Sequence, residues 1–305
     1  MAVRPLRALA EAGHDIALCV TRPDRRRGRG GALTPSPVKA AARELGIPVS
    51  HSMDDVLESG VELAVVVAYG RIIPAALLEQ VPMVNVHFSL LPRWRGAAPV
   101  EWAILAGDDE TGVCLMKVEE GLDTGPVYAR RVVPLSGDID LAALRDRLVG
   151  EGSALLVESL AGGVAGLPTP VPQEGAPTIA PKLTPQDFLL HWEREAVQLH
   201  RVVRLGRAWT TFRGRRLGIL KATPGEAGAR AEAGVGGGAA GAAGEEGEEG
   251  AAIALPPGTL VGTAVIAGHG VLELEEVQPE SRAAMAADDW ARGARVSVGE
   301  RLGTD

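Results

Sequence analysis

The stretch from Met83 to Pro126 constrains the fold most, because it joins an apolar strand pattern to polar side chains. Met83 to His87 alternates in the manner of a strand, so Asn85 and His87 point to one face. Polar side chains on a buried strand need hydrogen-bond partners, or their face must border a cleft. Asp123 follows in a glycine-flanked turn. An amide, an imidazole and a carboxylate could therefore meet at the carboxyl edge of a parallel sheet.

Each of these three residues also has an ordinary structural interpretation. A lone histidine on a strand is more often a satisfied core residue than a catalyst. A lone asparagine usually binds a neighbouring loop, and an aspartate between glycines usually stabilises a turn. The functional interpretation rests on the three residues acting together.

The composition is that of a globular protein and allows two domains. The chain has 305 residues, enough for two separate cores. Its formal net charge of -8 argues against uniform coating of nucleic acid but leaves room for a local basic face. Cys19 and Cys114 lie in apolar runs, which predicts buried thiols in a reducing compartment and no disulfide. With no apolar run of about 18 residues and no signal-peptide core, we expect a cytoplasmic location.

Strand and helix patterns alternate over the first half of the chain. Strands are predicted at 16–20, 61–68, 83–87, 111–118 and 127–133, and helices at 4–12, 37–46, 73–78, 99–106 and after Asp140. This alternation indicates an α/β domain with a largely parallel sheet.

Glycine and proline divide the chain into three parts. Residues 1–165 form the first predicted domain, 166–184 read as a linker, and 185–305 form the second domain. Short strand patterns with glycine turns in the second domain predict a small β-barrel. Residues 225–252 are nearly all Gly, Ala and Glu, which cannot bury a core, so we expect a disordered insert there.

Two segments concentrate positive charge. The first, residues 21–31, carries Arg22, Arg25, Arg26, Arg27 and Arg29 among three glycines, and Lys39 follows on the next helix. It is either a solvated flexible loop or a cationic arm that orders on a phosphate backbone. Arginine favours the second interpretation, because its planar fork suits phosphates and base edges.

The second basic segment, residues 201–221, has no acidic residue. It includes Arg207, Arg213, Arg215 and Arg216, interrupted by aromatic residues. A sheet with a solvated charged face and a basic wall for nucleic acid are both compatible with this composition.

Three motifs in the central stretch resemble the folate-dependent formyltransferase family. Asn85 to Pro92 with Arg95 to Pro99 resembles the core of that family, and Glu120 to Pro126 resembles its second motif. These motifs do not separate enzymes that act on tRNA, purine precursors or amino sugars. Residues 21–39, 208–214 and 277–295 resemble segments of the methionyl-tRNA formyltransferases. The resemblance runs through almost the whole chain except the insert.

The resemblance implies a Rossmann-like catalytic domain, a linker and an OB-like β-barrel. It implies formyl transfer from 10-formyltetrahydrofolate to the α-amine of methionyl-initiator-tRNA. We also expect a monomer, and no metal, because the sequence has no His/Cys cluster to hold one. Asn85 and a protonated His87 would donate to the oxyanion, while Asp123 would raise the pKa of His87 and help to move a proton. The residues expected to bind folate are Ser89, Leu90, Leu91, Pro92, Tyr69 and Gly70. Those expected to bind tRNA are Arg22, Arg25, Arg26, Arg27, Arg29, Lys39, Arg207, Arg213, Arg215 and Arg216.

Other functions remain open at this point. The alternatives are formylation of a nucleotide-linked amino sugar, hydrolysis of the formyl-folate, and an RNA-binding protein with an inactive, truncated catalytic domain. A glycinamide ribonucleotide enzyme is disfavoured by the long C-terminal domain.

The chain departs from the family at its first residues. Family members open with a strand and a Gly-Thr-Pro turn, whereas here a helix is predicted from Arg4. Loss of that strand would leave a gap in the sheet, with two exposed strand edges. Our interpretation is a start recorded too late, rather than a chain that is badly destabilised.

Overall fold

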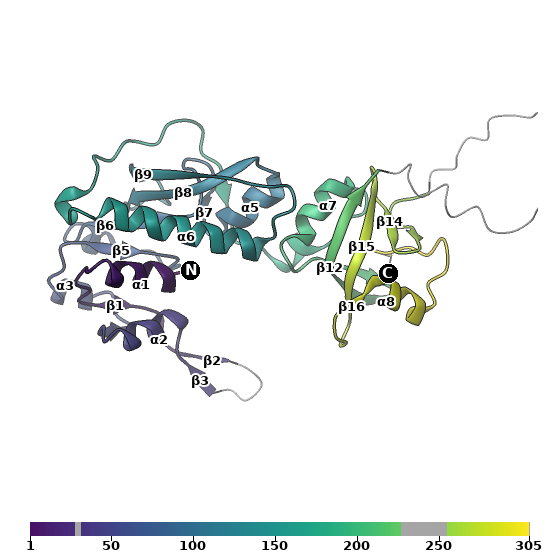
Figure 1. Ribbon diagram of the computed structural model, residues 1–305, viewed down its shortest axis with the longest axis horizontal. Coiled ribbons are helices and arrows are strands. Elements are labelled where there is room, and N and C mark those ends of the chain that lie inside the picture. Colours follow the sequence, from purple (N-terminus) through teal and green to yellow (C-terminus); the bar gives the residue numbers. More distant parts are fainter. Residues whose placement is uncertain (28–31, 227–254, 305) are drawn as a thin grey trace, which may run out of the picture. The chain divides into compact units, whose positions relative to one another are not determined.

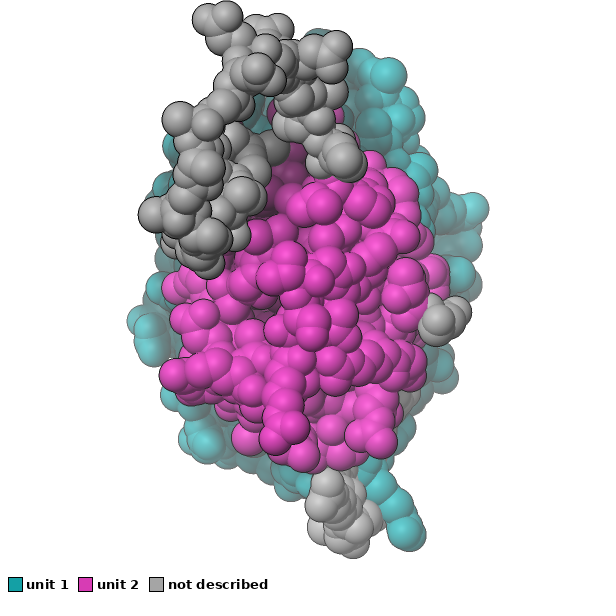
Figure 2. All heavy atoms as spheres, turned by 90° about the vertical axis from the view of Figure 1, so that its right-hand side faces the viewer, with its two compact units in different colours: residues 1–182 teal, residues 183–305 magenta. Residues whose placement is uncertain are grey.

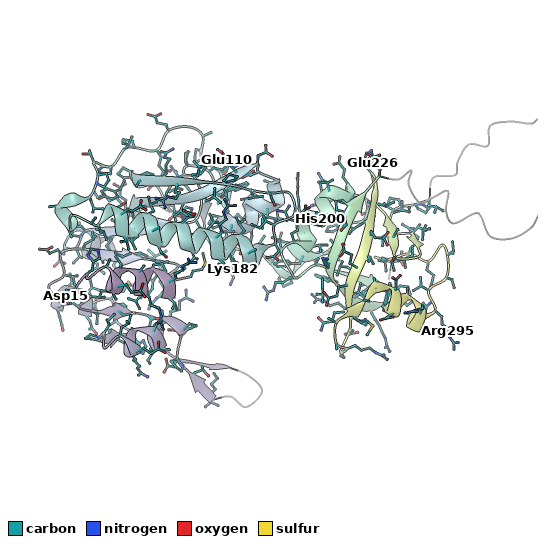
Figure 3. The ribbon with its side chains drawn as sticks, viewed as in Figure 1. Asp15, Glu110, Lys182, His200, Glu226 and Arg295 are labelled. Atoms are coloured by element: carbon teal, nitrogen blue, oxygen red, sulfur yellow. The ribbon has the colours of Figure 1, made fainter. Side chains whose placement is uncertain are left out.

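A computed structural model describes residues 1–27, 32–226 and 255–304. The chain divides into two compact units, Met1–Lys182 and Leu183–Asp305 (Figure 2). Lys182, labelled in Figure 3, lies within the segment predicted as the linker. Arg29 and most of the predicted disordered insert, 225–252, lie outside the described residues.

Unit 1 alternates strands and helices (Figure 1). Its helices are α1 (Val3–Glu11), α2 (Pro37–Glu44), α3 (Asp55–Glu58), α4 (Ala75–Leu78), α5 (Pro99–Ala106), α6 (Leu141–Ser159) and the 3-10 helix η1 (Val164–Gly166). Its main strands are β1 (Cys19–Val20), β4 (Val49–Ser50), β5 (Ala64–Val66), β6 (Met83–His87), β8 (Glu110–Lys117) and β9 (Val127–Pro134). The shorter strands are β2 (Arg25–Arg27), β3 (Ala32–Thr34), β7 (Arg95–Gly96) and β10 (Ile179–Ala180).

Local sequence explains where several helices begin and end. The Ser36 hydroxyl accepts a hydrogen bond from the Lys39 amide at 3.2 Å, which caps α2 as predicted. The Asp140 carboxylate accepts from the Ala143 amide at 2.7 Å and caps α6. Gly107 ends α5 in the left-handed conformation that glycine adopts without strain.

The main sheet has the order β5-β6-β8-β9. β5 and β6 are parallel, as predicted, while β8 runs antiparallel to both β6 and β9. Such mixed sheets are common in α/β folds. A Cβ added to Gly152 of α6 would touch Val86 and Val113, so α6 covers that face. Because neighbouring side chains on a strand alternate, Asn85 and His87 point to the opposite face.

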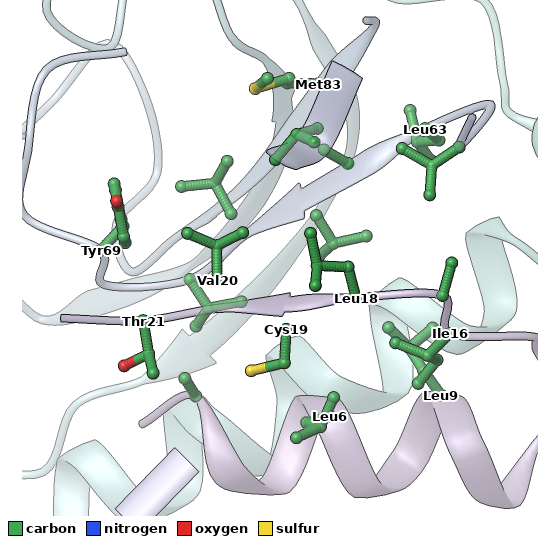
Figure 4. Close-up of a pocket in the computed structure, with 18 of the residues that line it drawn as sticks. Leu6, Leu9, Ile16, Leu18, Cys19, Val20, Thr21, Leu63, Tyr69 and Met83 are labelled. Atoms are coloured by element: carbon green, nitrogen blue, oxygen red, sulfur yellow. The ribbon is translucent and has the colours of Figure 1, made fainter. Parts of the chain in front are cut away.

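The predicted gap in the sheet is present. β1 and β4 form a separate parallel pair. Among the described residues, β1 pairs only with β4, and β5 only with β6. A cavity of about 940 Å³ lies beside both, lined by 16–23 from the β1 region and 61–69 from the β5 region. Figure 4 shows Leu18 and Val20 in this cavity, above Leu6 and Leu9 of α1.

Unit 2 is built on an antiparallel sheet of order β11-β12-β15-β14-β13, with β16 beside β15. The strands are β11 (Trp209–Phe212), β12 (Arg215–Gly225), β13 (Leu260–Val261), β14 (Ala264–Ile266), β15 (Val271–Pro279) and β16 (Met285–Ala286). The helices are η2 (Pro185–Phe188), α7 (Ala196–Val203) and α8 (Ala287–Ala294). Phe212 meets Trp290 of α8 edge to face, with ring centroids 5.1 Å apart. This confirms the prediction of a C-terminal β domain.

No helix in the described part of the chain has the length and apolar character needed to cross a membrane.

Candidate active site

His87 ends β6, and its ring is held by the loop that follows. Its side chain is 5% exposed, and Nε2 lies 2.9 Å from the carbonyl oxygen of Trp94. Because a carbonyl only accepts, Nε2 carries a hydrogen and Nδ1 is the free nitrogen of the neutral ring. Trp94 has φ +61, and its amide donates to the Thr178 hydroxyl at 2.8 Å. The loop therefore fixes the orientation of the imidazole.

Asp123 reaches the same place from a distant turn. Its Oδ2 lies 3.6 Å from His87 Nδ1 and accepts a hydrogen bond from the Gly96 amide at 2.8 Å. The first distance is too long for a hydrogen bond but short enough for strong electrostatic interaction. Glycine is required at position 96, because a Cβ there would lie 2.7 Å from the Ala180 carbonyl oxygen. The structure thus brings the predicted imidazole and carboxylate together.

Burial lowers the pKa of His87 below its usual 6.5. The carboxylate of Asp123 and the carbonyl of Trp94 oppose this effect without overcoming it. Asp123 thus raises the pKa of His87 as expected, but the pKa still lies below its usual value, so the neutral ring is favoured over the protonated ring that the sequence predicts. The physical reason is that desolvation of a nearly enclosed imidazolium outweighs one carboxylate at 3.6 Å.

Asn85 lies in the middle of β6, paired on its two sides with Val66 and Met116. Its side chain is half-buried and lies on the same face of the strand as His87. In the part of the chain that the structure describes, its side-chain amide has no hydrogen-bond partner. The side-chain amide is therefore available as a donor.

The residues predicted to bind folate fall into two groups. The side chains of Ser89 and Leu91 are buried: the Ser89 hydroxyl donates to the Arg93 carbonyl at 2.6 Å, and Leu91 packs in the core with Cys114. Leu90 and Pro92 are half-buried. Side-chain contacts with a ligand can therefore come from Leu90 and Pro92, and not from their buried neighbours.

Tyr69 and Gly70 lie elsewhere, after β5. Tyr69 lines the 940 Å³ cavity, and the Gly70 carbonyl accepts a hydrogen bond from Arg22 Nη2 at 2.5 Å. Asn85, His87 and Asp123 do not line this cavity. The structure therefore does not join all the predicted folate residues to the polar trio in one pocket.

Two predicted tRNA contacts are engaged within the protein. Lys39 is 7% exposed, and its ammonium lies 2.9 Å from both carboxylate oxygens of Asp24 and 3.3 Å from His51 Nε2. The Arg213 guanidinium forms a bidentate ion pair with the Glu300 carboxylate, with hydrogen bonds of 2.7 and 2.9 Å. These charges are neutralised by internal partners before any phosphate arrives.

The other basic residues differ in exposure. Arg26, Arg207, Arg215 and Arg216 are exposed, and the Arg216 guanidinium lies over the Trp209 ring at 4.5 Å. Arg22 is half-buried and held by Gly70. Arg25 and Arg27 belong to β2, but their side chains are not described.

Sequence reasoning missed three residues that shape the site: Trp94, Gln173 and Thr178. Gln173 donates to the carbonyl oxygens of Asp123 and Gly125, both at 2.8 Å. Gln173 and Thr178 lie in the segment predicted as a linker, where no periodicity points to a packed role. Among the described residues, no group of three or more His, Cys, Asp or Glu side chains could hold a metal ion.

Comparison with known proteins agrees with the two-unit organisation. The Formyl transferase family model matches residues 2–160, and the model for Formyl transferase, C-terminal domain, matches residues 182–295. A methionyl-tRNA formyltransferase of Heliobacterium modesticaldum is 40% identical over 99% of this chain and 96% of its own length. One of Thermus thermophilus is 41% identical over 95% of this chain and 92% of its own.

Solved structures share the fold at low identity. The N-formyltransferase of Helicobacter canadensis, in complex with folinic acid and dTDP-3-aminofucose, has a TM-score of 0.62 at 14% identity. That match covers 90% of this chain and 95% of that one. HypX of Aquifex aeolicus, in complex with tetrahydrofolic acid, has a TM-score of 0.56 at 19% identity and covers 85% of this chain and 44% of that one. The family models and near-full-length relatives therefore show that this chain belongs to the formyl transferase family, beside the methionyl-tRNA formyltransferases.

Proposed function

We propose that this chain transfers the formyl group of 10-formyltetrahydrofolate to the α-amine of methionine on initiator tRNA. The observation that carries the proposal is the 40% identity to a methionyl-tRNA formyltransferase over 96% of that protein. The pairing of His87 with Asp123 supports it, because formyl transfer needs a group that moves a proton beside the reacting amine.

The chemistry follows from the attack of a neutral amine on the formyl carbon. The carbonyl oxygen becomes an oxyanion, and the carbon–N10 bond then breaks as N10 takes up a proton. The free side-chain amide of Asn85 is suited to donate to the oxyanion. The neutral ring of His87 suits a base at Nδ1, which accepts the amine proton and passes it to N10.

Asp123 stabilises the charged intermediate of this relay. Its carboxylate lies 3.6 Å from Nδ1, so it favours the imidazolium that forms when His87 takes the proton. The Gly96 amide holds the carboxylate in place. Folate would meet this site through Leu90 and Pro92, which follow β6, with Tyr69 and Gly70 as a second predicted contact region.

The arginines of residues 21–31 provide the proposed contact with tRNA phosphates, and Arg26 among them is exposed. Replacing Arg25, Arg26, Arg27 and Arg29 by Ala should weaken tRNA binding and make it less dependent on salt. The slope of the logarithm of the binding constant against the logarithm of the salt concentration should fall by about one for each phosphate that is no longer bound. The matched control is Arg7→Ala, an exposed arginine already paired with Glu44. A salt slope unchanged by the fourfold replacement would contradict this role.

A formylation assay with two acceptors tests the function. The enzyme is given 10-formyltetrahydrofolate with either methionyl-initiator-tRNA or a nucleotide-linked amino sugar, and formylated product is measured. We expect formylated product when the acceptor is methionyl-initiator-tRNA, and no product when the acceptor is the amino sugar. Product with the sugar alone, loss of the formyl group without an acceptor, or folate binding without turnover would each replace the proposal by one of its alternatives.

A further inference from the structure

The segment that connects the two units contributes to the active site from within unit 1. We infer that Gln173 is a positioning residue for formyl transfer, which holds the Asp123 turn so that its carboxylate stays beside His87. This inference rests on the proposed function for its kinetic consequences and on the contacts of the segment for its geometry.

The side chain of Gln173 is fully engaged. Its Nε2 donates to the carbonyl oxygens of Asp123 and Gly125, both at 2.8 Å. Its Oε1 accepts from Arg95 Nε at 3.1 Å and Nη2 at 2.7 Å. Carbonyls only accept and a guanidinium only donates, so the amide can take only one orientation. Gln173 therefore links the Asp123 turn to β7.

The turn needs such support because Asp123 has φ +50, a conformation that residues other than glycine rarely adopt. Residues of this kind persist only where their surroundings hold them. Gln173 binds the backbone of Asp123 itself and of Gly125. The carboxylate is held by the Gly96 amide, and Gly96 pairs with Ala180 of the same connecting segment.

The same segment supports His87 from the other side. The Thr178 hydroxyl accepts from the amide of Trp94, a second residue with positive φ, and the Trp94 carbonyl faces His87 Nε2. The Thr178 carbonyl accepts from the Arg95 amide at 2.9 Å. Both halves of the imidazole–carboxylate pair are thus anchored to residues 173–180, within a stretch that composition marks only as a linker.

Two substitutions distinguish the hydrogen bonds of the Gln173 side chain from the space that it fills. Gln173→Ala removes all four hydrogen bonds. Gln173→Glu keeps the size and the contact with Arg95 but sets a carboxylate against two carbonyl oxygens. In single-turnover formylation we expect both to slow transfer by about tenfold to a hundredfold, as displacement of a catalytic group by about 1 Å does. The control is Glu174→Gln, at the exposed next residue, which should react like the wild type.

A double-mutant cycle tests whether Gln173 acts through Asp123. If it does, Gln173→Ala combined with Asp123→Asn should be no slower than Asp123→Asn alone. Rates that multiply would overturn the inference, because Gln173 would then act independently. A wild-type transfer rate in Gln173→Ala would overturn it as well.

A readout without substrate keeps the inference testable if the proposed function fails. The pKa of the His87 ring is measured by NMR, with thermal unfolding to confirm that each variant is folded. Asp123 is the charged group whose contact raises this pKa. Gln173→Ala should therefore lower it in the same direction as Asp123→Asn. A His87 pKa equal to that of the wild type would show that the carboxylate stays in place without Gln173.

Discussion

Two regions of unit 1 differ in how completely their side chains are packed: the strands β6 and β8, and the strands β5 and β1 beside the cavity. On the β6–β8 side, Val84, Val113, Cys114 and Leu115 are at most 1% exposed. On the other side, all three residues of β5 are only half-buried, and Cys19 of β1 is 8% exposed. The first side carries His87 at the end of β6, and the second borders the 940 Å³ cavity.

This difference indicates that the site is built on the rigid part of the fold. Asn85 is paired with Val66 of β5 and Met116 of β8, and His87 is paired with Cys114 of β8, so strand pairing fixes the backbone of both residues. Within the described part of the chain, β1 and β5 each have one edge without a partner strand and lack such constraint. Precise placement of reacting groups requires rigid support, which the packed side provides.

The largest expected difference between the two regions is in the free energy of unfolding that is lost when a leucine side chain is shortened to alanine. Leu115→Ala, at a side chain 1% exposed in β8, should lower the free energy of unfolding by about 2–5 kcal/mol. Leu18→Ala, at the cavity, should cost under about 1 kcal/mol, because the cavity already leaves part of its surface without packed neighbours. Urea unfolding of each variant measures its loss in the free energy of unfolding. Hydrogen exchange of the β8 amides provides a second measurement of the same quantity. Equal costs would remove the distinction.

Hydrogen exchange of the unsubstituted protein should show a somewhat smaller difference. Amides of β6 and β8 are expected to exchange only on global unfolding of unit 1, whereas β1 and β5 open locally. We expect opening free energies about 2 kcal/mol lower for β1 and β5, measured by native-state exchange. Uniform protection across the sheet would show that the cavity does not weaken its edges.

The buried histidine should make stability depend on pH. Because the folded protein lowers the pKa of His87 below 6.5, the unfolded chain binds more protons at acidic pH. Its contribution is complete above about pH 6.5 and is lost as pH falls below that value, by at most about 1.4 kcal/mol per pH unit. His87→Gln should flatten the dependence in urea unfolding between pH 5 and pH 7. An unchanged slope would indicate that the ring is not buried as described.

The smallest expected difference between the two regions is in the reaction rates of their cysteine thiols. Burial raises the pKa of both thiols, so both should react slowly at neutral pH and faster as pH rises. Cys19 lines the cavity, while Cys114 is fully buried in β8. Modification by a small thiol reagent, followed by mass spectrometry, should label Cys19 severalfold faster. Faster labelling of Cys114 would contradict the packing contrast.

Sequence reasoning predicted the packed side better than the cavity side. β6 has the predicted bounds, because its alternation and its neighbours agree. β1 and β5 are shorter than the apolar runs at 16–20 and 61–68 predict. Apolar content alone does not make a strand where one edge has no partner. The antiparallel direction of β8 is a property of tertiary pairing, which no local pattern records.

For the site, polar residues on apolar elements can be found from the sequence, but their backbone partners cannot. The setting of Asn85, His87 and Asp123 and the family resemblance both point to these residues, and two of them do meet. The carbonyl of Trp94 and the amide of Gly96 have no side-chain signature. Gln173 acts across 50 residues of sequence, which composition cannot reveal. The pKa of His87 depends on how deeply the fold buries it, which the strand pattern does not indicate.

The most direct test of the account is single-turnover formyl transfer to methionyl-initiator-tRNA by His87→Ala and Asp123→Asn, with Leu18→Ala as the control from the cavity side. A proton relay through this pair predicts losses of about 10²- to 10⁴-fold for the first two at saturating substrates, and near-normal transfer for the control. Near-normal transfer by either site variant would contradict the placement of the reaction at the end of β6.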